Sequence, residues 1–349
     1  MNTPNGTLRR WFRLLLGISV SGAFVLWLTH TVNSKDILAA MAGITPLSIA
    51  ASLGILVLSI PLRAVQWIWL MEPPNRISFR ASVQYICLGH LANLFLPLRG
   101  GEVVKAGLLS RKTGLPFESA LASVALCRLQ DLPPIFIVSG VVAFLLNPGS
   151  VSADLAQAGL DIDPGVTRAA IWGMGIAMVA LLGGFTAAFL ALEQLQALMA
   201  WIARPFPEKF RVWILRRSEH VLGSLRVVRR ASPFWGAQAL SLLCWVIFAV
   251  ASVPILAAFD LPMPLSIRAA VSIAAFGTFA QVIPAAPSAL GVFHAACLGA
   301  LAVSAPSLSH SDALAIAVIV HLVGNIGPAL PGVLVLVFPS VRRSPYASQ

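Results

Sequence analysis

Residues 81–109 read ASVQYICLGHLANLFLPLRGGEVVKAGLL, an apolar stretch that is interrupted in its middle by LPLRGG at 96–101. The stretch is longer than the roughly 20 apolar residues that a membrane crossing needs. A proline, two adjacent glycines and an arginine at its centre are incompatible with one straight helix. We therefore predict a broken helical hairpin here, with one half-helix on each side of the break.

The composition indicates that lipid is the solvent of this chain. Of its 349 residues, 58% are hydrophobic and 11% are charged, whereas a soluble domain carries roughly 25% charged residues. The mean hydropathy is +0.86. So little charge cannot keep a surface wet, and no polar stretch is long enough to form a separate soluble domain. We therefore expect a single all-α, polytopic membrane domain over residues 1–349.

Apolar segments of crossing length recur along the chain. A second region, 269–303, is broken like the first, by IPAAPS at 283–288. Six further segments are expected to be complete crossings, at about 12–30, 46–71, 119–146, 169–192, 234–258 and 312–338. The predicted architecture is therefore about six full spans and two re-entrant broken-helix hairpins.

The formal net charge of +11 has a topological explanation. If both hairpins enter and leave the membrane on the same side, most Lys and Arg residues gather on one face. The other face then keeps only Lys35, Arg168 and Arg268. Because basic segments stay in the cytoplasm, we predict a multi-pass protein of the inner (cytoplasmic) membrane with both termini in the cytoplasm. A nucleic-acid partner is not expected.

The order of span, hairpin and span over 46–146 recurs over 234–338. The first hairpin would enter from the cytoplasm and the second from outside, which is an inverted-topology repeat. The alternative is that any proline-rich membrane helix produces this likeness. The halves are joined by a polar connection at 193–233, whose basic part at 204–230 is expected to face anionic lipid head groups. Docking of a cytosolic partner is the alternative for that segment.

Charged residues cluster at the first break, although each costs about 2.5–3.5 kcal/mol at the centre of a bilayer. Arg99, Glu102 and Lys105 lie at the break, and Arg128 and Asp131 lie one helical turn apart in the next span. The set is completed by Arg63 in the preceding span and by Asn93 and His90 just before the break.

Two explanations of this cluster stay open. Salt bridges of Glu102 with Lys105 and Arg128, or of Arg128 with Asp131, would be purely structural. Yet four cations face two anions, and the surplus of about two positive charges favours binding of an anion. A half-helix that returns after the glycines at 100–101 would also aim its free N–H groups at this place. A phosphate is the natural ligand, because arginine binds it in a bidentate manner.

The second hairpin carries fewer charges. Its candidate residues are Pro284, Ser288, Gly291 and His294, and its return half-helix is expected to begin near Ala286 or Pro287. A buried histidine such as His294 is more often a hydrogen-bonded core residue than a proton carrier. His321 and Asn325 share a face of the last span and could meet it.

No catalytic constellation is recognisable in the sequence. There is no nucleotide-binding loop, no HExxH, no nucleophile elbow and no group of acids with metal-ligand spacing. The four cysteines stand alone in apolar runs. We expect neither an enzyme nor a cofactor or metal site, and we name no catalytic residue.

Several of these motifs occur together in a known family. They are NLFLPLRGGE at 93–102, the basic RKTG at 111–114 and the span from Ser119 that ends in CRLQD at 127–131. With them the sequence resembles the lysylphosphatidylglycerol synthase transmembrane (flippase-like) family. In the second half, IP at 283–284 and LGVF at 290–293 are similar to the family's P-x-x-x-G-G-x-G-V-x-E signature. Ser288, Ala289 and His294 stand where the family usually has a glycine pair and a glutamate.

The resemblance implies a stand-alone member without the cytosolic aminoacyl-transferase domain, which moves lipid and does not make it. The expected function is a flippase that moves a phospholipid, or a related anionic or aminoacylated lipid, between leaflets. Arg99, Lys105 and Arg128 would hold the phosphate, while Glu102 and Asp131 would orient those cations. The alternatives are a carrier of a small soluble anion and a non-transporting subunit that docks a partner through its basic segment. The expected partners are membrane lipids, anionic phospholipid among them, and a homo-oligomer stays an open option.

Overall fold

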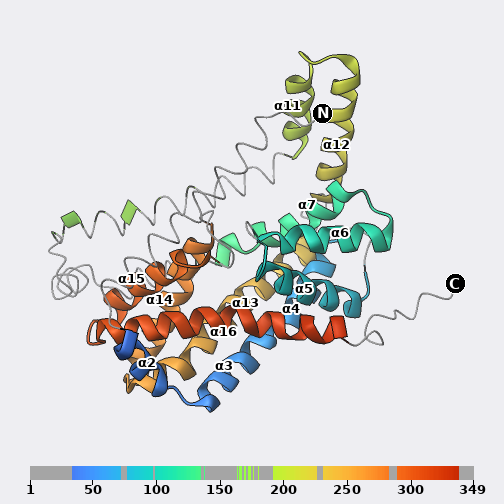
Figure 1. The fold of residues 1–349 in the computed structure, drawn as a ribbon. Coiled ribbons are helices and arrows are strands. Elements are labelled where there is room, and N and C mark those ends of the chain that lie inside the picture. Colours follow the sequence, from blue (N-terminus) through green and yellow to red (C-terminus); the bar gives the residue numbers. More distant parts are fainter. Residues whose placement is uncertain are drawn as a thin grey trace.

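The computed structural model describes residues 34–71, 77–96, 99–134, 192–225, 231–282 and 289–337, with single or paired positions between 137 and 180. Within these ranges every regular element is a helix (Figure 1). The prediction of an all-α fold is therefore confirmed. The predicted span at 12–30 and most of that at 169–192 lie outside the described residues.

The described chain opens with helices α2 (Ser34–Ala42), α3 (Pro46–Val57) and α4 (Ser59–Trp69). Together α3 and α4 form a run of 24 residues, Pro46–Trp69, that is long and apolar enough to cross a membrane, as predicted for 46–71. The run is interrupted by a turn at Leu58. Pro61 explains the interruption, because it has no N–H group to donate to the carbonyl of Val57.

The first broken region folds as two helices, α5 (Phe79–Asn93) and α6 (Gly101–Thr113), which pack against each other. The Asn93 side chain ties the break together, because its Oδ1 accepts a hydrogen bond from the Gly101 N–H at 2.7 Å. A Cβ atom on Gly101 would collide with the carbonyl oxygen of Gly89. The glycine therefore allows the half-helices to approach closely.

Helix α7 (Phe117–Leu129) is shorter than predicted. The crossing predicted over 119–146 is described only in part: the chain turns at residues 130–131, and residues 132–134 are helical again. The prolines at 133–134 account for the turn, since they have no N–H groups to bond the carbonyls four residues earlier. The turn leaves the acidic end of α7 outside a regular helix.

The second half of the described chain contains α11 (Leu192–Ala203), α12 (Glu208–Leu225), α13 (Ala231–Leu256), the short helix η3 (Ala257–Phe259), α14 (Met263–Val282), α15 (Val292–Ser304) and α16 (His310–Val337). Two long apolar helices, Ser232–Phe259 and His310–Val337, agree with the spans predicted at 234–258 and 312–338.

Helices α14 and α15 form the second broken hairpin and pack against each other. The return helix α15 begins at Val292, later than the start predicted near 286–287. Gly291 precedes it with φ of 86°, a conformation that a right-handed helix excludes, so the helix starts only after this glycine.

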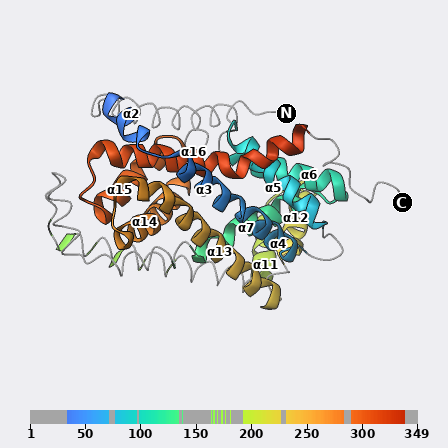
Figure 2. The ribbon, with the colours of Figure 1, turned by 90° about the horizontal axis from the view of Figure 1, so that it is seen from below.

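The two hairpins lie at opposite ends of the long helix α16. Figures 1 and 2 both show α14 and α15 near one end of α16, and α5 and α6 near the other. The contacts agree, because α16 meets α15 at His321 and meets α5 at Gly332. An inverted repeat would have this arrangement, although the repeat and the place of each hairpin in a membrane remain predictions.

Apolar packing forms a separate core around each hairpin. Around the second hairpin, buried side chains of α3, α13, α14, α15 and α16 pack together, including Leu56, Ile255, Ile273, Phe293 and Ile316. Around the first, α4 to α7 contribute another set, including Ile60, Trp67, Ile86, Leu109 and Val124. The charged residues of the first hairpin lie against this core of α4 to α7.

Candidate functional site

Glu102 is the acceptor at the centre of a buried ion-pair cluster. It lies in the first turn of α6, where a carboxylate is favoured by the helix dipole. Its Oε1 accepts a hydrogen bond from Arg128 Nε at 3.0 Å and is also paired with Arg128 Nη2, so the arginine contacts it through two nitrogens. Its Oε2 forms an ion pair with Lys105, one turn further along α6. One carboxylate therefore serves two cations.

Asp131 is the second acceptor, at the turn that ends α7. Its Oδ1 pairs with Arg63 of α4, and its Oδ2 lies 3.3 Å from Arg128 Nη1. The hydroxyl of Ser241, on α13, donates to Oδ1 at 2.6 Å. Arg63 in turn donates to Gln66 Oε1 at 3.1 Å. Asp131 thereby joins three helices that are far apart in the sequence.

Burial makes the charge balance of the cluster important. The side chains of Asp131, Lys105 and Glu102 are 6%, 10% and 14% exposed, while the arginines at 63 and 128 are 19% and 31% exposed. Three paired cations, Arg63, Lys105 and Arg128, thus share two carboxylates. A surplus positive charge in a poorly hydrated site is costly unless an anion or water compensates for it.

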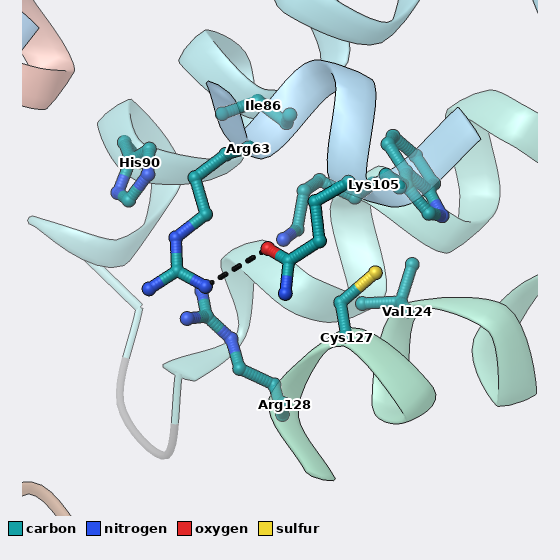
Figure 3. Close-up of a pocket in the computed structure, with 9 residues that line it drawn as sticks. Arg63, Ile86, His90, Lys105, Val124, Cys127 and Arg128 are labelled. Carbon is teal, nitrogen blue, oxygen red and sulfur yellow. Dashed lines mark hydrogen bonds between the residues drawn. The ribbon is translucent and has the colours of Figure 1, made fainter. Parts of the chain in front are cut away.

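A small cavity of about 30 Å³ lies beside these cations. Figure 3 shows the guanidinium groups of Arg63 and Arg128 pointing toward one another in it, with Lys105 and His90 on its wall. Gln66 also lines the cavity, and its buried Nε2 has no hydrogen-bond acceptor among the described residues. A cavity with these donors fits a polar, electron-rich group better than an apolar one.

The apolar wall of the cavity holds the cations in place. Trp67 lies on the Lys105 side, with the ammonium 5.9 Å from its ring centroid. The indole nitrogen of Trp67 donates to Ser123 Oγ at 3.2 Å, which fixes the ring between α4 and α7. A cation on an aromatic face is stabilised without being neutralised.

Most of the residues predicted for the first hairpin meet in this cluster. The structure brings together Arg63, Glu102, Lys105, Arg128 and Asp131. The salt bridges expected of Glu102 with Lys105 and Arg128, and of Arg128 with Asp131, are all formed. Asn93 has a different position, since it caps the start of α6. Arg99 is exposed at the break, with φ of 55°.

The second hairpin forms a separate polar contact. Gly291 N–H donates to His294 Nδ1 at 3.2 Å, and the His294 ring lies 4.6 Å from that of His321 on α16. Of the two residues that could have met His294, His321 is thus in contact with it. Asn325 bonds the carbonyl of His321 within α16. Pro284 and Ser288 lie outside the described residues.

Sequence reasoning missed two members of the cluster. Gln66 follows Arg63 by three residues, a helical spacing that could have indicated the contact. Ser241 had no such signal, because a serine in an apolar helix is commonly bonded to its own backbone. Its role appears only when α13 is placed against the end of α7.

The fold and the cluster define a class of protein: a multi-pass helical membrane protein with a buried ion-pair cluster at a helix break. The comparison with known families narrows this class. The chain belongs to the family described as the lysylphosphatidylglycerol synthase TM region, which matches residues 14–332. The family to which the sequence was expected to belong is thus confirmed.

One relative shows how the matched region occurs in a longer protein. The chain is 25% identical over 347 residues to a protein of Haloferax volcanii named Glycosyltransferase AglD. The alignment covers 95% of this chain and 55% of the relative. The chain therefore spans about half the length of that relative.

Proposed function

We propose that this protein moves a phospholipid, or a related anionic or aminoacylated lipid, between the leaflets of the inner membrane. The family and its association with membrane lipids support a lipid-related role. The observation that carries the proposal is the cluster in which Arg63, Lys105 and Arg128 share only Glu102 and Asp131. Such a cluster is suited to a ligand that brings negative charge into the membrane interior.

A lipid phosphate offers the chemistry that the cluster needs. Its oxygens can replace those of a carboxylate on arginine, because the planar fork of the guanidinium group can donate two hydrogen bonds to either anion. Arg99 stands exposed at the break and is the cation that an arriving head group would meet first. Lys105 and Arg128 would then take over the phosphate from inside.

Binding of a phosphate would require the cluster to open. The cavity of about 30 Å³ has room for about one water molecule, which is less than a phosphate with its ester oxygens. The carboxylates of Glu102 and Asp131 would have to move from their partners as the phosphate enters. The lipid phosphate would thus replace the two carboxylates as the partner of the cations. This replacement would couple lipid binding to movement of α6 against α7.

A membrane-embedded enzyme is the rival that the comparison raises, since the relative is named a glycosyltransferase. The chain spans about half of that protein, so the name does not carry over to it. Both carboxylates of the cluster are held in ion pairs with arginine or lysine, which favours an orienting role over acid–base chemistry. We propose that the chain moves lipid and catalyses no reaction on it.

Reconstitution into vesicles tests the proposal. Purified protein in liposomes with head-group-labelled phosphatidylglycerol should speed the exposure of inner-leaflet lipid to a membrane-impermeant quencher. Arg99→Gln should lower the rate at limiting lipid by roughly ten-fold or more, as expected when a hydrogen bond to a charged group is lost. Arg99 is exposed, and an unchanged melting temperature of the variant in detergent would show that the fold is kept.

The matched control is Arg111→Gln, an exposed arginine at the other end of α6. It removes the same charge and should leave the rate unchanged. If the vesicles instead take up inorganic phosphate and leave labelled lipid in place, the protein is a carrier of soluble anions. If inorganic phosphate and a series of anionic and aminoacylated lipids all stay in place, the proposed transport is contradicted and the docking role becomes the better explanation.

A further inference from the structure

The α11–α12 hairpin stands apart from the rest of the molecule. Figure 1 shows it projecting from the helical body, and Figures 1 and 2 together show that it runs transverse to α16. It is attached through α12, which packs on α7 and joins it by an ion pair between Arg217 and Glu118. If α16 crosses the membrane, a hairpin in this direction runs along the membrane surface.

Large aromatic side chains of this hairpin are exposed. Trp201 on α11 is 64% exposed, while Phe210 and Trp213 on α12 are 52% and 54% exposed. Phe206, in the turn between the helices, packs against Phe210, which packs against Trp213, each pair with tilted rings and 5.6 Å between ring centroids. A continuous apolar surface of this kind on a membrane protein indicates contact with another phase or partner.

Basic side chains flank the same aromatic face. At 3.6 residues per turn, Lys209, Trp213 and Arg216 fall within about a third of the circumference of α12 together with Phe210. The Arg217 guanidinium lies 5.7 Å from the Trp213 ring and closes the row toward α7. Arg211 lies on the opposite side of the helix from this face.

We propose that the α11–α12 hairpin lies on the membrane surface and binds anionic phospholipid head groups through the aromatic and basic face of α12. Tryptophan favours the boundary between head groups and acyl chains. Lysine and arginine beside it are attracted to anionic lipid. Apolar insertion and charge attraction are the two components by which an amphipathic helix holds to a bilayer surface.

Charge and direction together favour lipid over a protein partner. The described hairpin carries five Lys or Arg, at 204, 209, 211, 216 and 217, and three Glu, at 193, 208 and 219. The acids are not on the aromatic face: Glu208 and Glu219 lie elsewhere on the α12 circumference. A surface with its cations beside exposed tryptophan matches an anionic membrane and would not select one protein.

Amide hydrogen exchange of the full-length protein in nanodiscs tests this proposal. Peptides from 192–225 should exchange more slowly in discs of phosphatidylcholine with phosphatidylglycerol than in discs of phosphatidylcholine alone. Arg216→Gln should reduce that added protection about five-fold, the effect of one cation near an anionic surface. Arg211→Gln is the matched control on the opposite side of the same helix and should have a much smaller effect.

Exchange in α13 and α16 should be equal in all variants, which shows that the fold is kept. The proposal is overturned if protection of 192–225 is the same in both kinds of disc, or if the two arginine variants behave alike. This readout needs no lipid movement, so it can succeed or fail independently of the proposed transport.

Discussion

At the scale of single residues, the cations of the cluster differ in how many carboxylates each one contacts. Arg128 contacts both carboxylates, and Arg63 is paired with Asp131. Removal of either would break pairs inside the protein. Lys105 contacts one carboxylate, that of Glu102, which it shares with Arg128, so its removal leaves that carboxylate paired.

The first prediction compares Glu102→Gln with Lys105→Met. Loss of Glu102 leaves Lys105 and Arg128 without their shared anion, and breaking a buried pair in this way costs about 3–5 kcal/mol. Loss of Lys105 leaves two cations on two carboxylates, which is a balanced set, so Lys105→Met should cost much less. The free energy of unfolding by titration with dodecyl sulfate in mixed micelles measures both. Equal destabilisation would show that the surplus charge does not exist in the folded protein.

The second prediction concerns Ser241, which reaches Asp131 from α13. Ser241→Ala should lower the free energy of unfolding by about 1.5–3 kcal/mol, the usual loss for a hydrogen bond to a charged group. Ser252→Ala is its control on the same helix, because Ser252 donates to the carbonyl of Phe248 within α13. A similar loss for both serines would mean that Asp131 does not depend on α13.

At the scale of elements, the two breaks share a backbone feature that the sequence pattern did not reveal. Arg99 and Ala289 have φ of 55° and 56°, and each comes shortly before the return half-helix of its hairpin. A side chain in this region costs about 1–3 kcal/mol, so its occurrence in both breaks is a specific likeness. If these two residues correspond in the two halves, then Pro97 corresponds to Pro287, since each proline precedes its left-handed residue by two positions. The apolar residues before each proline instead align Pro97 with Pro284, which shifts the alignment of the two halves by three residues.

The third prediction tests how tightly the first break is closed. In Gly101→Ala the new Cβ would collide with the Gly89 carbonyl oxygen and lie 2.6 Å from Asn93 Oδ1. The half-helices must then separate, which should cost about 1–3 kcal/mol or more in the free energy of unfolding. Gly107→Ala, on the same helix, meets nothing within 4 Å, and should be neutral or stabilising by up to about 1 kcal/mol. Both variants can be followed by the same titration, and a stable Gly101→Ala protein would contradict the close packing.

At the scale of the whole molecule, hydropathy predicted the helices well and their interruptions poorly. The long apolar helices at Ser232–Phe259 and His310–Val337 follow from composition and length. The turn at Leu58 and the end of α7 at Leu129 do not, because proline in an apolar run is compatible with either a kink or a stop. The charged residues of the first break were predictable as a cluster because charge inside a membrane needs a partner. The hydrogen bond from Ser241 to Asp131 was not predictable, because it depends on the packing of α13 against the end of α7.

The last prediction concerns the two ends of the molecule. Lys112 is exposed at the end of α6, and Ser307 is exposed between α15 and α16. Figure 1 places these segments at opposite ends of α16. Because basic segments stay in the cytoplasm, a membrane-impermeant maleimide should label Ser307→Cys in intact cells. It should label Lys112→Cys only after the membrane is permeabilised.

The unaltered chain gives the background of this experiment, since Cys87, Cys244 and Cys297 are buried and Cys127 is half-buried. The two outcomes that contradict the prediction have different meanings. If Lys112→Cys is labelled in intact cells and Ser307→Cys only after permeabilisation, the orientation is the reverse of the predicted one. The two hairpins would still lie on opposite sides, as an inverted repeat requires. Labelling of both positions from one side would place both hairpins on that side, and a mechanism in which two inverted halves expose the cluster alternately would then be excluded.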